Sequence, residues 1–169
     1  MLENAKGCRA DEITALVMDR PRHEALIAKI RASGAKVKLI TDGDVAGVIE
    51  TTDPATNVDI YMGQGGAPEG VLAAAALRCV GGQMQGRLLF RNDDERARAA
   101  KWGVKDLNRK YGLHELVSGD VVFSATGVTD GSMLSGVHRV GDFITTESVV
   151  MRSATGTVRW IRTRHRRGA

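Results

Sequence analysis

The sequence predicts an α/β fold in which a mixed β-sheet is flanked by helices. Over the first hundred residues, short apolar segments of strand length alternate with segments of helical periodicity, which is typical of a largely parallel sheet. Over the last third, short strand-like segments follow one another closely, with Gly and Asp between them, which favours an antiparallel extension of the same sheet. Because 43% of the 169 residues are hydrophobic, we expect a single domain over residues 1–169 with its own core.

The first two thirds of the chain provide the alternating elements. Leu26, Ile27 and Ile30 repeat at helical spacing, and Gly34 follows as a stop signal. Pro68 suits the first turn of a helix, where an N–H would have no partner. The N-terminal segment resembles the end of a helix. The expected strands are 13–19, 36–40, 58–63 and 84–90, and the expected helices are 22–34, 42–50, 68 to about 80, and 93–103.

The last third is expected to add four strands, at 121–129, 136–140, 143–152 and 156–163. Much of the net charge of +4 comes from the segment RWIRTRHRR at 159–167, which favours an anionic partner without choosing among phosphates and nucleic acid. Cys8 and Cys79 form no CxxC pair, so reduced thiols in a cytoplasmic protein are the simplest interpretation. No apolar run reaches about 18 residues and no signal peptide is recognisable, so we expect no membrane association.

Three polar turns follow the first three predicted strands. They are the segment from Asp19 to His23, the segment from Asp42 to Asp44, and the glycine-rich loop from Gly63 to Gly70. In open α/β sheets, ligands bind outside the carboxyl ends of the strands. If these strands are parallel neighbours, all three turns face one crevice.

The glycine-rich loop, GQGGAPEG, matches no standard nucleotide motif. Pro68 stands where G-x-G-x-x-G needs glycine, and Val71-Leu72 stands where a P-loop needs Lys-Ser/Thr. The loop amides at a helix N-terminus could still bind an anion. Alternatively, the loop is only a tight strand–helix turn, in which Glu69 complements the helix dipole.

The other two turns also leave alternatives open. Arg20 and Arg22 could grip a phosphate with their guanidinium groups, or they could be a solvated pair at a helix start, of which His23 is then a part. Asp42 and Asp44 could bind a hard cation or sugar hydroxyls, or they could be a helix cap and a turn acid. The histidines show no metal-ligand spacing, and Ser124 has no neighbouring pattern that would make it a nucleophile.

Several segments together resemble one family. DRPRHEALI, TDGDVAG, GQGGAPEGVLAAAALRCVGG, VFSATGVTDGSML and ITTESVVMR are similar to class II fructose-1,6-bisphosphatases, the bacterial GlpX-type enzymes, from about Leu2 to about His165. The resemblance implies the C-terminal domain of the lithium-sensitive sugar phosphatase fold. It also implies hydrolysis of the 1-phosphate of fructose 1,6-bisphosphate with Mn²⁺ or Mg²⁺, in gluconeogenesis or carbon fixation. Some photosynthetic members also accept sedoheptulose 1,7-bisphosphate.

The resemblance assigns roles to the three turns. The implied substrate-binding residues are Arg20, Pro21, Arg22, Asp42, Gly43, Asp44 and Gly66. The two arginines would bind the phosphate that is not cleaved, although many relatives have Lys at the position of Arg20. The Asp-Gly-Asp turn would contact the sugar, with Gly66 lying against it. Glu69 would be a metal ligand, and its cation would then share a phosphate with the loop amides.

This sequence departs from the family in length, because family members are roughly twice as long. Their other acidic metal ligands, and with them the expected catalytic residues, lie in an N-terminal half that has no counterpart here. The chain therefore resembles the C-terminal, substrate-binding half alone. We expect a homo-oligomer when the protein is complete, and an N-terminal half on a partner chain is an alternative.

Two competing functions remain from the sequence. One is a non-catalytic sugar-phosphate-binding partner, which the missing ligands favour. The other is a nucleic-acid binder that uses the segment 159–167, but an aromatic content of 4% and the absence of a recognition motif argue against it. We therefore expect a sugar bisphosphate, and no nucleic acid, as the ligand.

Overall fold

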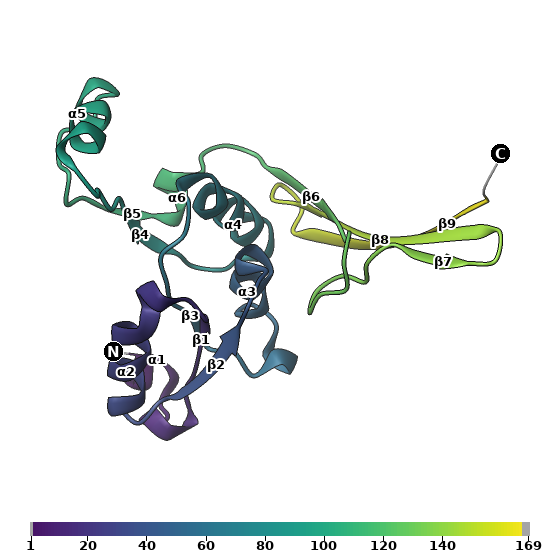
Figure 1. Cartoon of the computed structure of the whole chain (residues 1–169), viewed down its shortest axis with the longest axis horizontal. Helices are drawn as coiled ribbons and strands as arrows, with labels where there is room; N and C mark the ends of the chain where they lie inside the picture. Colours follow the sequence, from purple (N-terminus) through teal and green to yellow (C-terminus); the bar gives the residue numbers. More distant parts are fainter. Residues whose placement is uncertain (1, 167–169) are drawn as a thin grey trace.

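The computed structural model of the chain describes residues 2–166, which form helices and three separate sheets (Figure 1). A parallel three-stranded sheet lies in the first third, with β1 (Thr14–Met18) between β2 (Lys36–Ile40) and β3 (Ile60–Tyr61). The parallel core predicted from the alternation is confirmed for these strands. However, β3 is much shorter than the expected strand at 58–63.

Helices cover both faces of the parallel sheet. Ala15 and Val17 of β1 pack against Ile27 and Ile30 of α2 (Glu24–Ala32). Leu16, which lies between them, points to the opposite face, toward α3 (Asp44–Glu50). There it packs so close to Gly47 that a Cβ on this glycine would be 2.8 Å from Cδ2 of Leu16. Since successive side chains of a strand alternate between faces, this packing explains why β1 is apolar almost throughout.

The alanine-rich helix α4 (Ala67–Val80) is the centre of the molecule. Ala73 and Leu77 pack with Val48 of α3 in one cluster, whereas Ala76 and Cys79 pack in another cluster that belongs to the second large sheet. Small side chains allow α4 to approach both neighbours closely. The helix begins one residue before the expected start and ends at the expected residue, and Gly81 follows it in the left-handed conformation (φ +80°).

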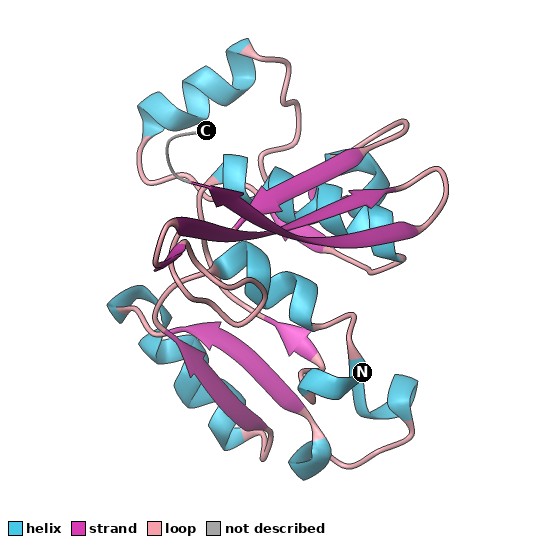
Figure 2. Cartoon of the chain, turned by 90° about the vertical axis from the view of Figure 1, so that its right-hand side faces the viewer, coloured by secondary structure: helices cyan, strands magenta, loops and turns pink. Residues whose placement is uncertain are grey.

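The last third forms an antiparallel sheet of its own. It contains β6 (Val122–Thr126), β7 (His138–Val140), β8 (Phe143–Arg152) and β9 (Thr157–Arg166), with β8 pairing with the other three. Phe123, Val149 and Met151 of this sheet pack on α4. The expectation of one mixed sheet is therefore wrong, because α3 and α4 lie between the two sheets (Figure 1), which Figure 2 shows as two separate groups of strands.

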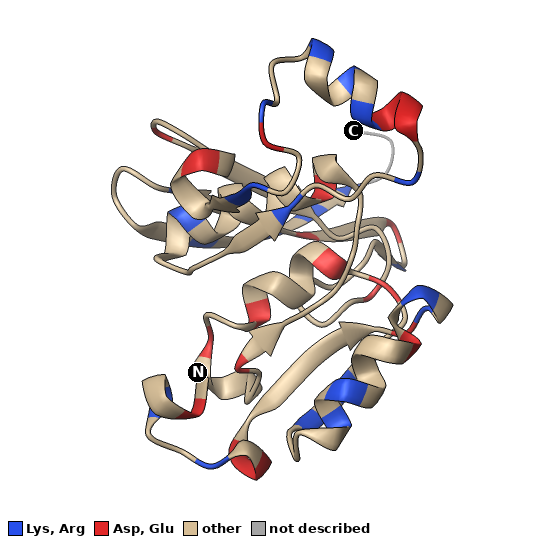
Figure 3. Ribbon diagram, turned by 90° about the vertical axis from the view of Figure 1, so that its left-hand side faces the viewer, with Lys and Arg blue, Asp and Glu red and all other residues tan. Residues whose placement is uncertain are grey.

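The fourth strand of the alternation also lies outside the parallel sheet. β4 (Gln85–Arg87) pairs antiparallel with β5 (Lys110–Gly112). The chain segment that connects these two strands contains α5 (Asp93–Lys101). Three acids begin α5 and two basic residues end it, which complements the helix dipole (Figure 3). Of α5, only Ala99 is buried, and the following Trp102 is 82% exposed.

Short helical elements complete the described chain. They are α1 (Leu2–Lys6), α6 (Leu113–Leu116) and three 3-10 turns, η1 (Ala10–Glu12), η2 (Pro21–His23) and η3 (Pro54–Thr56). No helix within residues 2–166 combines the length and the apolar character that crossing a membrane requires.

Candidate functional site

The three polar turns meet at one edge of the parallel sheet. Because β1 pairs in parallel with both neighbours, the loops that follow β1, β2 and β3 all leave at the carboxyl ends of their strands. The turn after β1 is central, with the loop after β2 on one side and the glycine loop on the other. The strands are therefore parallel neighbours, as the prediction of a shared site required, and the three turns lie at one edge of the sheet.

The two arginines of the central turn reach in opposite directions. Arg20 donates from Nη2 to the carbonyl of Thr41 in the loop after β2 (2.6 Å), and from Nη1 to the carbonyl of Asp19 (3.0 Å). Arg22 donates from Nε and Nη2 to the carbonyl of Gln64 in the glycine loop (3.1 and 3.0 Å). Pro21, at the start of η2, fixes the backbone between them. The turn after β1 is thus hydrogen-bonded to the backbone of both neighbouring loops.

The Asp-Gly-Asp turn leads into α3. Gly43 is the N-cap residue and has φ +80°, a conformation that favours glycine. The carboxylates of Asp42 and Asp44 accept hydrogen bonds from the backbone N–H groups of Gly43 (2.8 Å) and Val45 (2.9 Å), respectively. Neither caps the helix in the usual manner, since no side-chain cap is formed there. Acceptor oxygens therefore remain for a ligand on both acids.

The glycine loop ends at the N-terminus of α4, where Glu69 lies in the first turn. The Glu69 carboxylate folds back over Gly66, so that a side chain on Gly66 would overlap it. A Cβ on Gly66 would therefore displace the Glu69 carboxylate, whereas the backbone angles of Gly66 are those of an extended residue (φ −66°) and do not need glycine. This arrangement places a negative charge directly above the backbone of the loop.

The loops after β2 and β3 are in contact with each other. A Cβ on Gly65 would lie 3.4 Å from Oδ2 of Asp44, so the two turns touch. Tyr61 of β3 is close enough to Asp44 and Arg22 for both charges to act on its hydroxyl. Burial raises the pKa of the Tyr61 hydroxyl and the charge of Asp44 raises it further, while the Arg22 guanidinium lowers it. The site therefore combines Arg22, Asp44 and Tyr61 within electrostatic range.

Sequence reasoning missed Tyr61, and it missed the contacts of His23. As expected, His23 stands at the helix start, between η2 and α2. It is also completely buried and hydrogen-bonded to the backbone of both β1 and the glycine loop. The apolar pattern around it gives no sign of this, because its partners are backbone groups far along the chain.

The described residues contain no complete set of metal ligands. Within residues 2–166, no group of three or more His, Cys, Asp and Glu side chains could hold a metal ion. Glu69 alone cannot provide the near-octahedral oxygen coordination that Mg²⁺ requires. The chain's own residues therefore do not fit a cation without further ligands.

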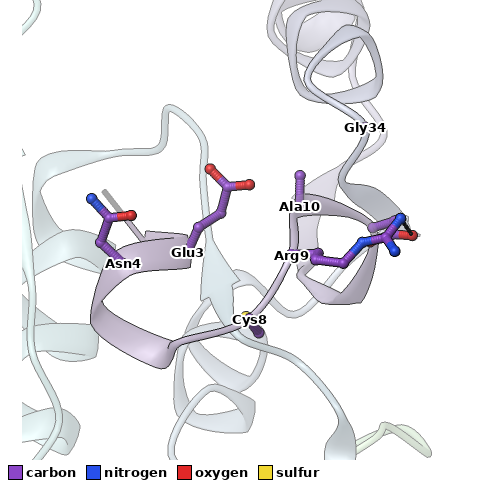
Figure 4. Close-up of a pocket in the computed structure, with 7 residues that line it drawn as sticks. Glu3, Asn4, Cys8, Arg9, Ala10 and Gly34 are labelled. Atoms are coloured by element: carbon purple, nitrogen blue, oxygen red, sulfur yellow. Dashed lines mark hydrogen bonds and ion pairs between the residues drawn. The ribbon is translucent and has the colours of Figure 1, made fainter.

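A surface hollow occurs elsewhere, and it is separate from these turns. It is lined by residues of the N-terminal segment and Gly34, among them Glu3, Asn4 and Cys8 (Figure 4). Since these residues precede β1 and β2 in the chain, the hollow lies toward the amino ends of the strands, opposite the candidate site.

The geometry defines a class of protein: an α/β protein whose arginine, aspartate and glycine turns lie together at the carboxyl edge of a parallel sheet. Comparison with known proteins is consistent with this class. The model of the family described as "Bacterial fructose-1,6-bisphosphatase, glpX-encoded" matches residues 1–165. The chain belongs to this family.

Individual relatives give the extent of the match. Proteins named D-fructose 1,6-bisphosphatase class 2/sedoheptulose 1,7-bisphosphatase from Microcystis aeruginosa, Synechocystis sp. and Synechococcus elongatus are 40%, 39% and 41% identical to the chain. Each alignment covers 92% of this chain and 49% of the relative. The chain thus spans about half the length of the curated relatives it matches.

Proposed function

We propose that this chain is the substrate-binding part of a class 2 fructose-1,6-bisphosphatase, which hydrolyses the 1-phosphate of fructose 1,6-bisphosphate. Family membership supports the reaction class, and the names of the relatives add sedoheptulose 1,7-bisphosphate as a second substrate. In this proposal the reaction takes place in the cytoplasm, and the chain contributes recognition of the sugar and of the phosphate that stays attached.

The observation that carries this proposal is the pair of arginines on the central turn. Each guanidinium has five N–H donors and spends two of them on backbone carbonyls, so three remain on each. Within residues 2–166, neither Arg20 nor Arg22 has a carboxylate within ion-pair distance, although six other such pairs occur there. Two anchored guanidinium groups on one turn, neither of them paired with a carboxylate, are suited to a phosphate group.

The remaining residues of the edge suit a sugar. Asp42 and Asp44 keep acceptor oxygens, which hydroxyl groups can reach as donors. Gly66 lets a ligand approach the backbone of the loop closely, because no Cβ projects there. With the phosphate held by the arginines, these contacts would fix the orientation of the sugar chain and direct its other end toward the start of α4.

We propose Glu69 as one ligand of the Mn²⁺ or Mg²⁺ on which the family resemblance makes the reaction depend. A cation there would polarise the reacting phosphate. Since one carboxylate does not make such a site, the other ligands would come from a second polypeptide segment. Val71 and Leu72, which follow Glu69 closely, are large apolar side chains left exposed on α4, where such a segment could pack.

The surface area of the chain supports a covering partner. Its accessible surface is 11,392 Å², whereas a compact monomer of 18.1 kDa has about 8,100 Å². The excess of about 3,300 Å² is in the range that obligate assemblies bury. We propose that a polypeptide corresponding to the unmatched half of the relatives covers it, and that the complete protein is a homo-oligomer.

The test uses the purified chain, fructose 1,6-bisphosphate and Mn²⁺. We expect calorimetry to show binding of the sugar bisphosphate that is weakened by salt, with little release of phosphate, because too few metal ligands are present. Absence of binding at millimolar concentration would contradict the substrate-binding role. Rapid Mn²⁺-dependent turnover by the chain alone would instead contradict the need for outside ligands.

A second candidate function is a sugar-phosphate-binding partner without catalysis. The lack of a metal-binding cluster within residues 2–166 favours it. Addition of a polypeptide that carries the unmatched half of a relative distinguishes the two: turnover that appears only in the mixture supports the enzyme, and unchanged binding without turnover supports the non-catalytic partner.

A further inference from the structure

His23 is the most deeply buried ionisable side chain among residues 2–166, with no exposed surface. It lies where β1 passes into α2, directly after the two arginines. Its Nδ1 is 2.8 Å from the carbonyl oxygen of Met18, at the end of β1. Its Nε2 is 2.9 Å from the backbone nitrogen of Gln64, in the glycine loop. One imidazole thus joins the end of β1 to the glycine loop, in which Gln64 lies 41 residues after His23.

These two contacts define the protonation state of the ring. The backbone N–H of Gln64 can only donate, so Nε2 must accept and carry no proton. The carbonyl of Met18 can only accept, so Nδ1 must carry the proton and donate. The ring is therefore neutral and in the Nδ1–H form. In an imidazolium, Nε2 would also carry a proton, and two donors, Nε2–H and the N–H of Gln64, would face each other.

The backbone of Gln64 is held at both its N–H and its carbonyl by the same turn. Its N–H donates to His23, and its carbonyl accepts two hydrogen bonds from Arg22. Gly63 allows the ring to lie close, since a Cβ there would be 3.2 Å from Cε1 of His23. The glycine loop consequently has a fixed position relative to Arg22, even though its residues are exposed.

Both nitrogens of His23 are occupied by backbone groups. No lone pair remains for a cation and no free N–H remains for a substrate, so direct chemistry by this ring is inconsistent with the arrangement. Its burial also separates it from a ligand at the exposed edge. The ring can instead fix the distance between the arginine turn and the glycine loop, whose other residues would contact the ligand.

We propose that His23 is a positioning residue, whose neutral Nδ1–H form sets the spacing between the arginine turn and the glycine loop. This inference rests on the proposed function, because the groups it positions are Arg22 on one side and Gly66 with Glu69 on the other. Without the ring, the Gln64 N–H loses its partner and the carbonyl that anchors Arg22 is no longer fixed. The affinity for the ligand then falls, because the site must be ordered at the moment of binding.

The first measurement is the nitrogen NMR spectrum of the His23 ring in the purified chain. We expect a protonated Nδ1 and an unprotonated Nε2 over the neutral pH range. An Nε2–H form or an imidazolium at neutral pH would overturn the proposal. This result does not depend on any ligand, so it stands apart from the proposed function.

The second measurement compares two variants that each keep one of the two contacts. In His23→Gln, the side-chain oxygen can accept from Gln64 near the position of Nε2. In His23→Asn, the amide can donate to Met18 near the position of Nδ1, but the contact with the loop is lost. We expect hydrogen exchange at the Gln64 amide to accelerate in His23→Asn and to stay near that of the unmodified chain in His23→Gln.

Binding of fructose 1,6-bisphosphate should follow the same order. We expect about a 3- to 10-fold loss of affinity in His23→Asn and a smaller loss in His23→Gln, as for one neutral hydrogen bond. Equal losses or equal exchange rates in the two variants would overturn the positioning role. If the unmodified chain binds no sugar bisphosphate, the proposed function fails, and exchange at Gln64 still decides the role of His23. Should His23→Asn not fold, the ring spectrum and His23→Gln remain decisive. Rapid exchange at the Gln64 amide in a folded His23→Gln would overturn the positioning role.

Discussion

The parallel sheet and the antiparallel sheet differ in how their ends are held. At the carboxyl edge of the parallel sheet, side chains of the central turn bind the backbone of both neighbouring loops, through Arg20, Arg22 and His23. In the antiparallel sheet, burial is concentrated where β8 packs on α4, around Val149 and Met151, while all of β7 is exposed. The polar groups of the first region are therefore held in place by contacts within the chain, whereas part of the second region is exposed.

The largest effect is expected where the antiparallel sheet meets α4. Met151 is 2% exposed and lies in the same cluster as Ala76 and Phe123. Met151→Ala removes packing from a filled core, so we expect a loss of about 2–5 kcal/mol in the free energy of unfolding, measured with urea. Val140→Ala, at a 65% exposed position of the same sheet, is the control and should change stability by about 0.5 kcal/mol or less. Similar losses in both variants would show that the sheet is stabilised along its whole length.

At the candidate site, the expected effect is on binding. Arg22→Ala removes charge-assisted hydrogen bonds to a phosphate, worth about 1.5–3 kcal/mol, so affinity for fructose 1,6-bisphosphate should fall about 10- to 150-fold. Arg139→Ala makes the same change of charge on β7, in the other region, and should leave affinity within about 2-fold. A comparable loss in both variants, measured by calorimetry at one ionic strength, would mean that the chain binds anions by its overall charge.

The difference between the regions also explains what the sequence could predict. β1, β2, α4 and β8 were predicted nearly at their observed bounds, because apolar periodicity and terminal Gly or Pro residues act within a few positions. The last third is antiparallel, as predicted, but the prediction that it extends the first sheet was wrong, since the alternation does not say that α4 separates β8 from β1. The prediction that the fourth strand belongs to the parallel sheet was also wrong, because its partner β5 was not recognised in the sequence.

For the candidate site, the local turns were predictable and their mutual contacts were not. The sequence indicated Arg20, Arg22, Asp44 and Glu69 by residue type at strand ends, and the structure brings their loops to one edge. Their roles remain predictions. His23 was assigned only to a helix start, because its bonds to two backbone groups leave no trace in local spacing.

Two glycines that flank α4 separate a requirement of the site from a requirement of the fold. Gly81 has φ +80°, so Gly81→Ala should reduce the free energy of unfolding by about 1–2 kcal/mol and leave binding unchanged. Gly66 has an ordinary φ of −66°, so Gly66→Ala should keep stability. Its methyl group displaces the Glu69 carboxylate and should weaken binding of fructose 1,6-bisphosphate about 5-fold or more. Urea unfolding and calorimetry on both variants check this, and unimpaired binding by Gly66→Ala would place the ligand elsewhere.

The smallest expected effect concerns the contact that joins the two regions. Glu50, at the end of α3, is nearly buried and interacts with Lys38 of β2 (2.9 Å) and with Ser132 of the loop between β6 and β7. Burial raises the pKa of the Glu50 carboxyl, but the hydrogen bonds from Ser132 and Lys38, with the charge of Lys38, outweigh it and hold the pKa below its ordinary value. Such a group stabilises the fold at neutral pH, and the contribution is lost as the pH falls from about 4.5 through the lowered pKa.

Glu50→Gln keeps the size of the side chain and an acceptor for Ser132 but removes the charge. We expect it to lower the free energy of unfolding by about 1 kcal/mol or less at pH 7, because Lys38 is partly exposed. The difference from the unmodified chain should shrink between pH 5 and pH 3, where the unmodified carboxyl also takes up a proton. Ser132→Ala, which acts from the antiparallel side, should remove part of the same pH dependence. A difference that stays constant down to pH 3 would show that the size of residue 50, and not its charge, joins the two regions.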